Sequence, residues 1–180
     1  MASWPAIARR VRVPLGFAFA VFYFWLAKPT VRCMLLGSVF VTAGLCLRGI
    51  ASGYLRKNEQ LAMAGPYAYT RNPLYLGSVL MAFGFVLAAR DWWIALAAAI
   101  FFMAIYLPVV FSEEQFLRAR FPEFEEYARR VPRFLVRFGP VGAEGGRFSW
   151  DLYLKHREYN ALLGAVVMMA ALVGKMAWWG

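Results

Sequence analysis

Histidine and cysteine are scarce in this chain of 180 residues, which contains one histidine and two cysteines. Cys33 and Cys46 form no CxxC pair and no group with the spacing of metal ligands. Zinc and haem sites draw most of their ligands from these two residue types, so the scarcity argues against either kind of centre. It also leaves no disulfide framework, and we expect no metal site.

Apolar residues, in contrast, are in excess: 62% of the chain is hydrophobic and its mean hydropathy is +0.53. A soluble domain is about half apolar, whereas a membrane-spanning helix needs roughly 20 mostly apolar residues. Five apolar runs approach this length, at residues 11–27, 33–50, 74–89, 92–111 and 159–179. The first run is interrupted and the third is short, but flanking residues can extend such spans to the interface. We therefore expect an all-α, polytopic membrane helical bundle with about five spans, forming one domain over residues 1–180.

Acidic residues are few, since ten Asp and Glu accompany twenty Lys and Arg and give a formal net charge of +10. If the N-terminus is cytoplasmic, all but four of the cationic residues fall on or near the cytoplasmic side, as the positive-inside rule requires. The basicity then reflects topology and attraction to anionic lipid, and we expect no nucleic acid partner. The exceptions are Lys28, Arg32, Arg90 and Lys175.

This topology predicts an integral protein of the inner or cytoplasmic membrane whose C-terminus lies on the opposite side. Two longer interruptions, 51–73 and 112–158, then face the cytoplasm. In the second, apolar residues recur at helical spacing, and Pro122 predicts two short amphipathic helices that lie on the membrane or fold back over the spans. These apolar residues are Leu117, Phe121, Phe124, Ala128 and Val131. Residues 148–158 predict a further interfacial helix.

The stretch GPYAYTRNPLYLGS, residues 65–78, precedes the third span and has two interpretations. Asn72 and Pro73 are good residues for a helix start, so the stretch can be a capped entry and no more. Alternatively the helix N-terminus binds an anion, with Arg71 adding a cation. Aromatic rings for stacking on a flat ring or a cation are then supplied by Tyr67, Tyr69 and Tyr75.

Glu113 and Glu114 follow the fourth span directly. Spans three and four form a hairpin, so the acidic pair is expected at the same membrane face as Arg71 and Asn72. Carboxylates at a helix C-terminus oppose its dipole, which favours a functional role. The alternative is that they open the next helix, with Ser112 as its cap.

The ordered set Gly65-Pro66-Tyr67-x-Tyr69-x-Arg71-Asn72-Pro73-x-Tyr75-x-Gly77, Glu113-Glu114-x-x-Leu117, Phe121-Pro122, Tyr127 and Arg130-Val131-Pro132-Arg133 carries a family resemblance. It resembles the isoprenylcysteine carboxyl methyltransferases and, more broadly, the membrane methyltransferases that include phospholipid N-methyltransferases. The resemblance covers about residues 55–138 and implies S-adenosylmethionine as methyl donor, with S-adenosylhomocysteine as product, bound at the cytoplasmic face.

Carried over position by position, the resemblance implies the residues of the site. Those nearest the chemistry are Arg71, Asn72, Glu113 and Glu114. The implied cofactor-binding residues are these four with Tyr67, Pro73, Tyr75, Leu76, Gly77, Arg130 and Arg133. Taken from the pattern alone, the Arg129–Arg133 cluster is also compatible with a solvated or headgroup-facing surface.

Two departures from the family bear on the substrate. The family commonly has histidine where this chain has Asn72, and asparagine cannot titrate near neutral pH. The segment 108–111 lacks the basic residues that the eukaryotic enzymes carry nearby, which weakens the expectation of a prenylcysteine substrate. We expect methylation of a lipid-like or prenylated amphiphile, on a carboxylate or a related group. The alternatives are a nicotinamide-dependent sterol-type reductase and a non-enzymatic membrane scaffold.

Overall fold

The computed structural model describes residues 4–57, 59–141 and 146–179, and every regular element within these ranges is helical. The expected all-α bundle is therefore confirmed. The long helices are α1 (Trp4–Leu26), α2 (Val31–Tyr54), α3 (Pro73–Ala89), α4 (Trp92–Phe101), α5 (Leu107–Arg120) and α8 (Tyr159–Trp179). The short elements are η1 (Gly65–Ala68), η2 (Phe102–Tyr106), α6 (Phe124–Arg130) and α7 (Trp150–Lys155).

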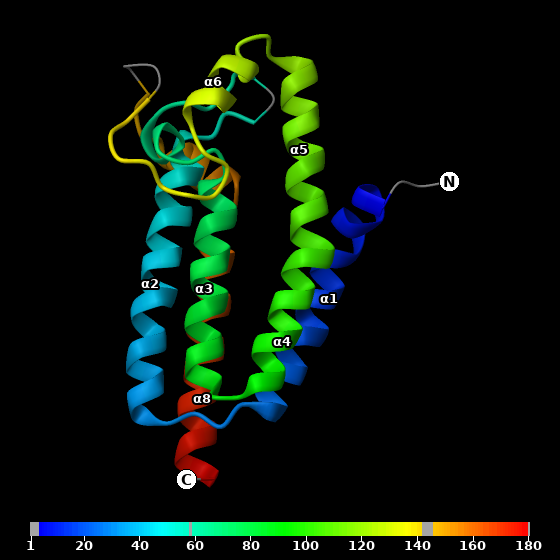
Figure 1. Cartoon of the computed structure of the whole chain (residues 1–180). Helices are drawn as coiled ribbons and strands as arrows, with labels where there is room; N and C mark the ends of the chain where they lie inside the picture. The colour runs from blue at the N-terminus through cyan, green and yellow to red at the C-terminus, as the bar shows by residue number, and fades with distance from the viewer. Residues whose placement is uncertain (1–3, 58, 142–145, 180) are drawn as a thin grey trace.

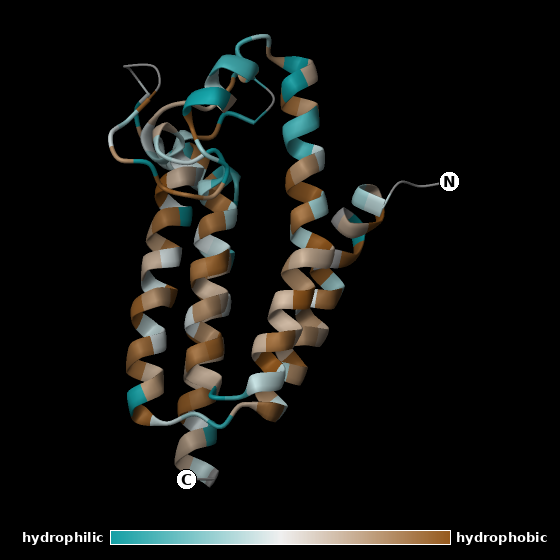
Figure 2. Ribbon diagram, in the orientation of Figure 1, coloured by the Kyte–Doolittle hydropathy of each residue, from teal (hydrophilic) through white to brown (hydrophobic). Residues whose placement is uncertain are grey.

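Helices α2 and α3 lie side by side and antiparallel, with α8 behind them, while α1 and the α4–α5 helix form a second pair (Figure 1). The polar segments gather at one end of the bundle (Figure 2). We call this end the polar cap, made of residues 55–57, 59–72, 121–141 and 146–158. The C-terminal end of α8 lies at the opposite end.

Glycine permits the close approach of α2 and α3. A Cβ atom built on Gly44 would lie 2.5 Å from the carbonyl oxygen of Gly77 and 2.7 Å from Cγ of Met81. Gly37 and Gly84 make the same kind of contact further along the pair. Small residues that let two backbones touch are the usual means of packing helices in lipid, where apolar burial provides little driving force.

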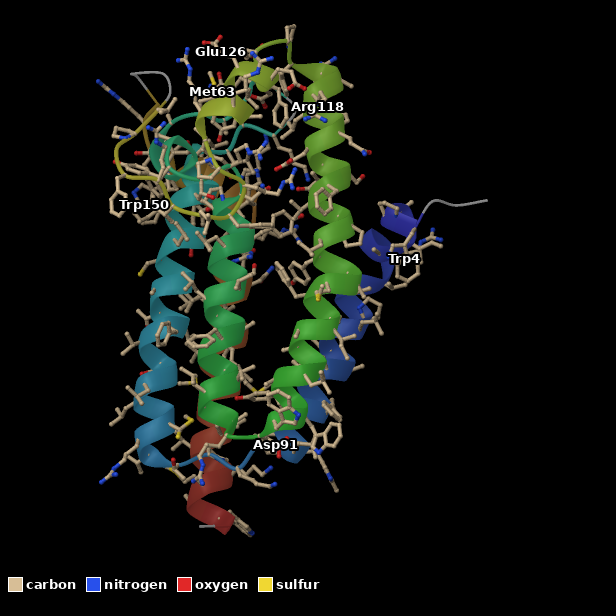
Figure 3. All side chains as sticks on the ribbon, viewed as in Figure 1. Trp4, Met63, Asp91, Arg118, Glu126 and Trp150 are labelled. Atoms are coloured by element: carbon tan, nitrogen blue, oxygen red, sulfur yellow. The ribbon has the colours of Figure 1, made fainter. Side chains whose placement is uncertain are left out.

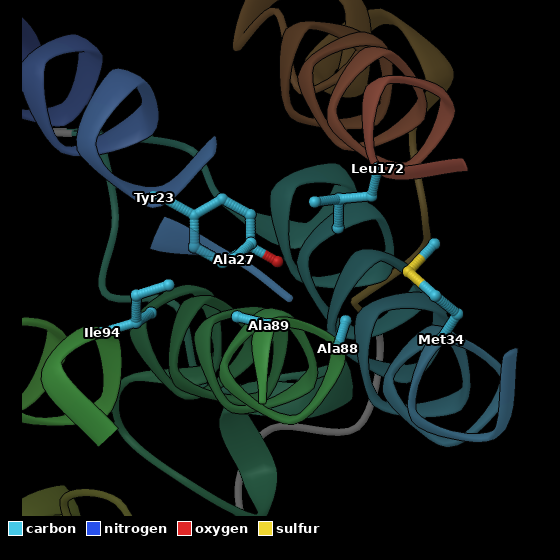
Figure 4. Close-up of a cluster of buried hydrophobic side chains, with 7 residues drawn as sticks. All are labelled: Tyr23, Ala27, Met34, Ala88, Ala89, Ile94 and Leu172. Carbon is cyan, nitrogen blue, oxygen red and sulfur yellow. The ribbon is translucent and has the colours of Figure 1, made fainter. Parts of the chain in front are cut away.

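The far end of the bundle is held by an apolar cluster and two short turns. Figure 4 shows the cluster, to which α1, α2, α3, α4 and α8 all contribute: Tyr23, Ala27, Met34, Ala88, Ala89, Ile94 and Leu172. Lys28 pairs with Asp91 at 3.2 Å and its backbone N–H donates to the carbonyl of Ala89, which ties the two turns together. Figure 3 labels Asp91 at this end, Met63 and Glu126 in the polar cap, and Arg118 near the end of α5.

The fourth span is longer than the sequence pattern indicates. Residues Trp92–Arg120 form one helical rod, with a π-helical turn at η2. The wider turn precedes Pro108, whose missing N–H and bulky ring would otherwise disturb the regular ladder. Glu113 and Glu114 thus lie inside a helix. Both sequence interpretations of their position were wrong: they do not terminate a helix, and Ser112 does not cap a new one.

The number of spans is confirmed only in part. Three helices, Val31–Tyr54, Trp92–Arg120 and Tyr159–Trp178, are long and apolar enough to cross a membrane. The apolar helices Val13–Leu26 and Pro73–Ala89 are shorter. The chain is therefore an integral membrane protein with five apolar helices, two of which need help from their flanks to span about 30 Å of hydrocarbon.

The amphipathic segment after α5 folds back on the cap. The five residues expected to share an apolar face pack in one cluster with Leu61, Met63, Tyr127 and Val141. The chain breaks between Arg120 and Phe124, around Pro122, as expected. The expected final helix over 148–158 corresponds to the shorter α7, which is capped by Ser149, whose hydroxyl accepts a hydrogen bond from the N–H of Leu152.

Candidate active site

Asn72 occupies the N-cap position of α3, and Pro73 is the first helical residue. The side chain of Asn72 does not cap the helix, however. Its Nδ2 donates instead to Oε1 of Glu114 at 3.0 Å and to the carbonyl oxygen of Arg133 at 3.3 Å. A residue type that ordinarily satisfies the helix terminus is therefore committed to a contact with α5 instead of its own helix.

Glu114 is the centre of the polar cluster. Only 5% of the residue is exposed, although it is charged. Nε of Arg133 donates to both carboxylate oxygens, at 3.1 and 3.0 Å, and its second terminal nitrogen donates to Oε2 at 2.8 Å. Arg71 stands 3.6 Å from Oε2. Burying a carboxylate requires such partners, and here they come from the segment before α3 and from the loop after α6.

Arg133 reaches Glu114 because hydrogen bonds hold its loop against the segment before α3. The N–H of Arg71 donates to the carbonyl of Pro132 at 2.9 Å, and the N–H of Arg137 donates to the carbonyl of Tyr69 at 3.1 Å. The hydroxyl of Thr70 donates to the carbonyl of Arg133. The guanidinium of Arg133 also lies over the Phe111 ring, 4.5 Å from the ring centroid.

Arg71 has unused hydrogen-bonding capacity. Its side chain is 12% exposed, and its Nε is buried without a hydrogen-bond partner. Buried donors are rarely left unpaired, so this atom marks a place where an acceptor from outside the chain fits. Together with the uncapped start of α3, it presents two kinds of donor to an anionic group.

Glu113 differs from its neighbour. It is half-buried, and its carboxylate takes part in none of the side-chain hydrogen bonds or ion pairs found among the described residues. Burial is the main cause that raises the pKa of Tyr67, and the charges of Tyr127 and Glu113 add to it. Of the acidic pair, Glu114 is thus held by the protein, and Glu113 is free to contact a ligand.

Two buried tyrosines line the cap. The hydroxyl of Tyr127 donates to the carbonyl of Tyr67 at 2.7 Å. Burial raises the pKa of Tyr67 and the pKa of Tyr127 well above the ordinary value. Neither phenol loses its proton near neutral pH, so neither serves as a general base.

The remaining expected residues are placed differently. Tyr75 packs edge-on against Tyr106, with ring centroids 5.9 Å apart, and Leu76 is half-buried in the first turn of α3. Gly77 faces α2, where the side chain of Arg48 and the backbone of Gly44 cover it. The close packing of α3 against α2 therefore explains why this residue is a glycine.

Arg130 is not brought to the cluster. Its side chain is 60% exposed and pairs with Glu126, one turn away on α6. The structure therefore groups Arg71, Asn72, Glu114 and Arg133, with Glu113 and Tyr67 beside them. The cofactor contacts of Gly77 and Arg130 stay predictions.

A second polar cluster joins Arg48 of α2 to Glu158, the residue before α8. Nε and one terminal nitrogen of Arg48 donate to the carboxylate of Glu158, at 2.8 to 3.0 Å. Arg48 also donates to the carbonyl of Leu74 and to the hydroxyl of Ser78. Glu158 lies 110 residues from Arg48 along the chain. An acidic residue just before an apolar run was the signal that was available.

An apolar cavity of about 360 Å³ lies between α1, α3, the α4–η2 segment and α8. Ser78, Tyr106 and Asn160 line it beside mostly apolar side chains. Ser78 lies on α3 five residues after Pro73, so the cavity begins a little more than one turn from the polar cluster. The arrangement is a charged, donor-rich site at the end of the bundle with an apolar chamber next to it.

Comparison with known proteins gives the family. A family model described as phospholipid methyltransferase matches residues 26–123. The cobalt-zinc-cadmium resistance protein CzcN of Cupriavidus metallidurans is 31% identical over 76% of this chain and 61% of its own length. The nickel-cobalt-cadmium resistance protein NccN of Alcaligenes xylosoxydans xylosoxydans is 33% identical over 67% of this chain and 56% of its own length.

The chain thus spans about three-fifths of the length of these curated relatives. No solved structure matches it. The matched region holds α2, α3, α5 and the residues Arg71, Asn72, Glu113 and Glu114. Since the model covers more than half of the chain, the protein belongs to the phospholipid methyltransferase family, a family of membrane methyltransferases.

Proposed function

We propose that the protein is an S-adenosylmethionine-dependent methyltransferase that modifies an amphiphilic membrane substrate at its polar cap. The observation that carries the proposal is the meeting of α3 and α5, in which Arg71 and Asn72 stand beside a twin-acid motif. The expected activity and the family assignment agree on methyl transfer. The family assignment favours it over the sterol-type reductase and the scaffold.

The donor set fits the proposed cofactor, which has an α-amino acid end, a ribose and an adenine ring. The unpartnered Nε of Arg71 and the N–H groups at the start of α3 suit its carboxylate. The unpaired carboxylate of Glu113 suits its ammonium or ribose hydroxyl groups. The cofactor, when bound, supplies a methyl group on a positively charged sulfur.

The protein's own contribution is to bind, to orient and to exclude water. Glu114 fixes the directions of Arg133 and Asn72 because it accepts hydrogen bonds from both. Backbone hydrogen bonds hold residues 132–141 against residues 68–72, which covers this cluster. A held geometry of this kind is the main requirement for a displacement on an already activated carbon.

Two features of the site indicate the class of substrate: its few candidates for a general base, and the apolar cavity beside it. Asn72 cannot act as a base, the two buried tyrosines keep their protons, and Glu114 is engaged by its partners. A substrate whose nucleophile is already deprotonated, such as a carboxylate, needs no base. An amine or thiol would use Glu113. The adjoining apolar cavity favours an amphiphile over a water-soluble acceptor.

We assign the polar cap to the cytoplasmic side. Most of the Lys and Arg residues of the chain lie at this end, as the positive-inside rule requires. A donor made in the cytoplasm then reaches the cap from water, while the acceptor reaches it from the bilayer. Labelling of single introduced cysteines from either side of sealed vesicles tests the assignment.

Calorimetric titration with S-adenosylhomocysteine tests the proposed function, with the reduced nicotinamide as the comparison ligand. We expect binding of the first and none of the second. Binding of the nicotinamide alone would favour the reductase. Incubating membranes with a labelled methyl donor, followed by extraction and chromatography, then identifies the methylated product.

The curated relatives are named for metal resistance, and those names concern those proteins. For this chain we propose metal tolerance only as an outcome of membrane methylation. Cells carrying an Arg71→Met variant should then lose tolerance to cobalt, zinc and cadmium to the same degree as cells without the gene.

A further inference from the structure

Two of the helices that line the apolar cavity beside the polar cap lie outside the region that the family model matches. That region begins at residue 26 and ends at residue 123. Phe19 and Tyr23 of α1 precede it, whereas Asn160, Gly164 and Met168 of α8 follow it. The matched region therefore supplies Arg71, Asn72 and Glu114 of the polar cluster, and two further helices supply part of the adjoining wall.

The α8 wall is one continuous helix face. Asn160, Gly164 and Met168 are spaced by four residues and so lie one above another, over about 12 Å of helix. The opposite wall on α3, from Ser78 to Val86, has the same length. Both walls begin at the end of the bundle that carries the polar cap. On the α4–η2 side the lining extends further, from Tyr106 to Ile94, so the cavity reaches the apolar cluster at the far end of the bundle.

Polarity changes along the cavity. Ser78, Tyr106 and Asn160 are its polar side chains at the cap end. Beyond them the lining is apolar, with Met81 and Phe85 from α3 facing the α8 wall. The one hydroxyl at the deep end, of Tyr23, donates to the carbonyl of Phe85 and is satisfied. A guest with a polar head and an apolar chain matches this gradient in one orientation only.

Gly164 leaves room in the wall. A Cβ atom built on it meets no heavy atom within 4 Å, so a side chain there enters open space without displacing the backbone. This contrasts with Gly37, Gly44, Gly77 and Gly84, where a Cβ atom would collide with the neighbouring helix. The glycine at 164 is therefore not explained by helix packing.

We propose that the α8 face Asn160–Gly164–Met168 selects the acceptor, because the missing side chain at Gly164 admits its single apolar chain. The proposal rests on the proposed function and adds the substrate class, an amphiphile with one chain in the cavity and its head at Ser78 and Asn160. A volume of about 360 Å³ is near the low end for ligand pockets and suits one chain rather than two.

Photolabelling tests the proposal without relying on turnover. The probe is a single-chain fatty acid with a diazirine near the end of its chain, used in phosphatidylcholine vesicles that contain the purified protein. Mass spectrometry then measures labelling of Met81 and Phe85 in the cavity wall. Leu163 and Val167, which are exposed on α8 and do not line the cavity, report labelling from bulk lipid in the same sample.

The variants compared are Gly164→Phe and Gly174→Phe. Gly174 lies on the same helix, also has open space around its Cβ and does not line the cavity. We expect the ratio of cavity-wall to outer-face labelling to fall severalfold in Gly164→Phe and to stay unchanged in Gly174→Phe. An equal fall in both variants, an unchanged ratio in Gly164→Phe, or no wall labelling in the wild type would overturn the proposal.

Titration with S-adenosylhomocysteine on the same preparations separates the two proposals. Retained binding with an unchanged labelling ratio overturns the acceptor site and leaves the methyltransferase standing. Absent binding in the wild type removes the methyltransferase, whatever the labelling shows. If Gly164→Phe does not fold, Ala161→Leu narrows the same wall and is held to the same outcomes.

Discussion

The amide nitrogen of Asn72 lies 3.0 Å from Oε1 of Glu114, and this hydrogen bond joins the first residue before α3 to the interior of α5. It brings together two residues that are 42 positions apart in the sequence. The helix-capping amide is thereby turned away from its own helix and toward a buried carboxylate. The candidate site forms because the Asn72 side chain bonds to Glu114 and does not cap α3.

The first prediction concerns Asn72 itself. A histidine at this position can donate one ring N–H to Glu114, whereas an aspartate places a second carboxylate against the first. We expect Asn72→His to bind S-adenosylhomocysteine within a few-fold of the wild type and Asn72→Asp to lose binding. Calorimetric titration measures both. Equal affinities for the two variants would show that the contact is irrelevant to the ligand.

The second prediction separates the two acids. Glu114→Gln leaves Arg71 and Arg133 without their shared anion, so it should lower the unfolding temperature as well as ligand affinity. Glu113→Gln removes a carboxylate that no described side chain engages. It should therefore weaken ligand binding by about 10- to 100-fold, the effect of one charge-assisted hydrogen bond, and leave thermal stability unchanged.

Thermal unfolding and titration of the same two variants check this prediction. A loss of stability in Glu113→Gln, or a stable Glu114→Gln with full affinity, would reverse the roles given to the two side chains.

The third prediction concerns the pairing of Arg48 with Glu158, whose side chains are 22% and 11% exposed. Replacing Glu158 by leucine leaves a largely buried cation unpaired and should destabilise the protein by up to about 3 kcal/mol. The double variant Arg48→Met, Glu158→Leu removes both charges and should recover part of that loss. Denaturation in mixed micelles gives the three free energies, and a double variant less stable than the single one would argue against an isolated pair.

The fourth prediction addresses helix packing. Any side chain at Gly44 collides with the backbone of Gly77, so Gly44→Val should cost about 1–3 kcal/mol. Gly16→Ala is the matched control because no heavy atom lies within 4 Å of its Cβ position. The two unfolding temperatures decide the matter, and similar values would mean that α2 and α3 are less closely held than their glycines indicate.

Local patterns predicted the helices well where one physical signal dominated. Apolar runs located the long helices, and Asn72-Pro73 located the start of α3. The end of α5 was missed because Ser112, Glu113 and Glu114 interrupt hydrophobicity without interrupting the helical backbone. Hydropathy reports where lipid ends, whereas a helix continues until a residue such as Pro122 stops it.

The candidate site, too, was predicted only in part from the sequence. The hairpin of α3 and α5 was enough to predict that Arg71 and Asn72 meet the acidic pair. It was not enough to predict which acid is buried, since neighbouring residues on a helix point about 100° apart and only packing chooses between them. Nor does any local pattern place Glu158 against Arg48, because that contact depends on how α8 docks.

The central claim is that the cluster at the start of α3 binds the methyl donor. Its most direct test is calorimetric titration of S-adenosylhomocysteine into the wild type, Arg71→Met and Arg32→Met, the last being an exposed arginine at the far end of the bundle. The account predicts binding to the wild type and to Arg32→Met and loss of binding in folded Arg71→Met. No binding to the folded wild type, or undiminished binding to Arg71→Met, would contradict it.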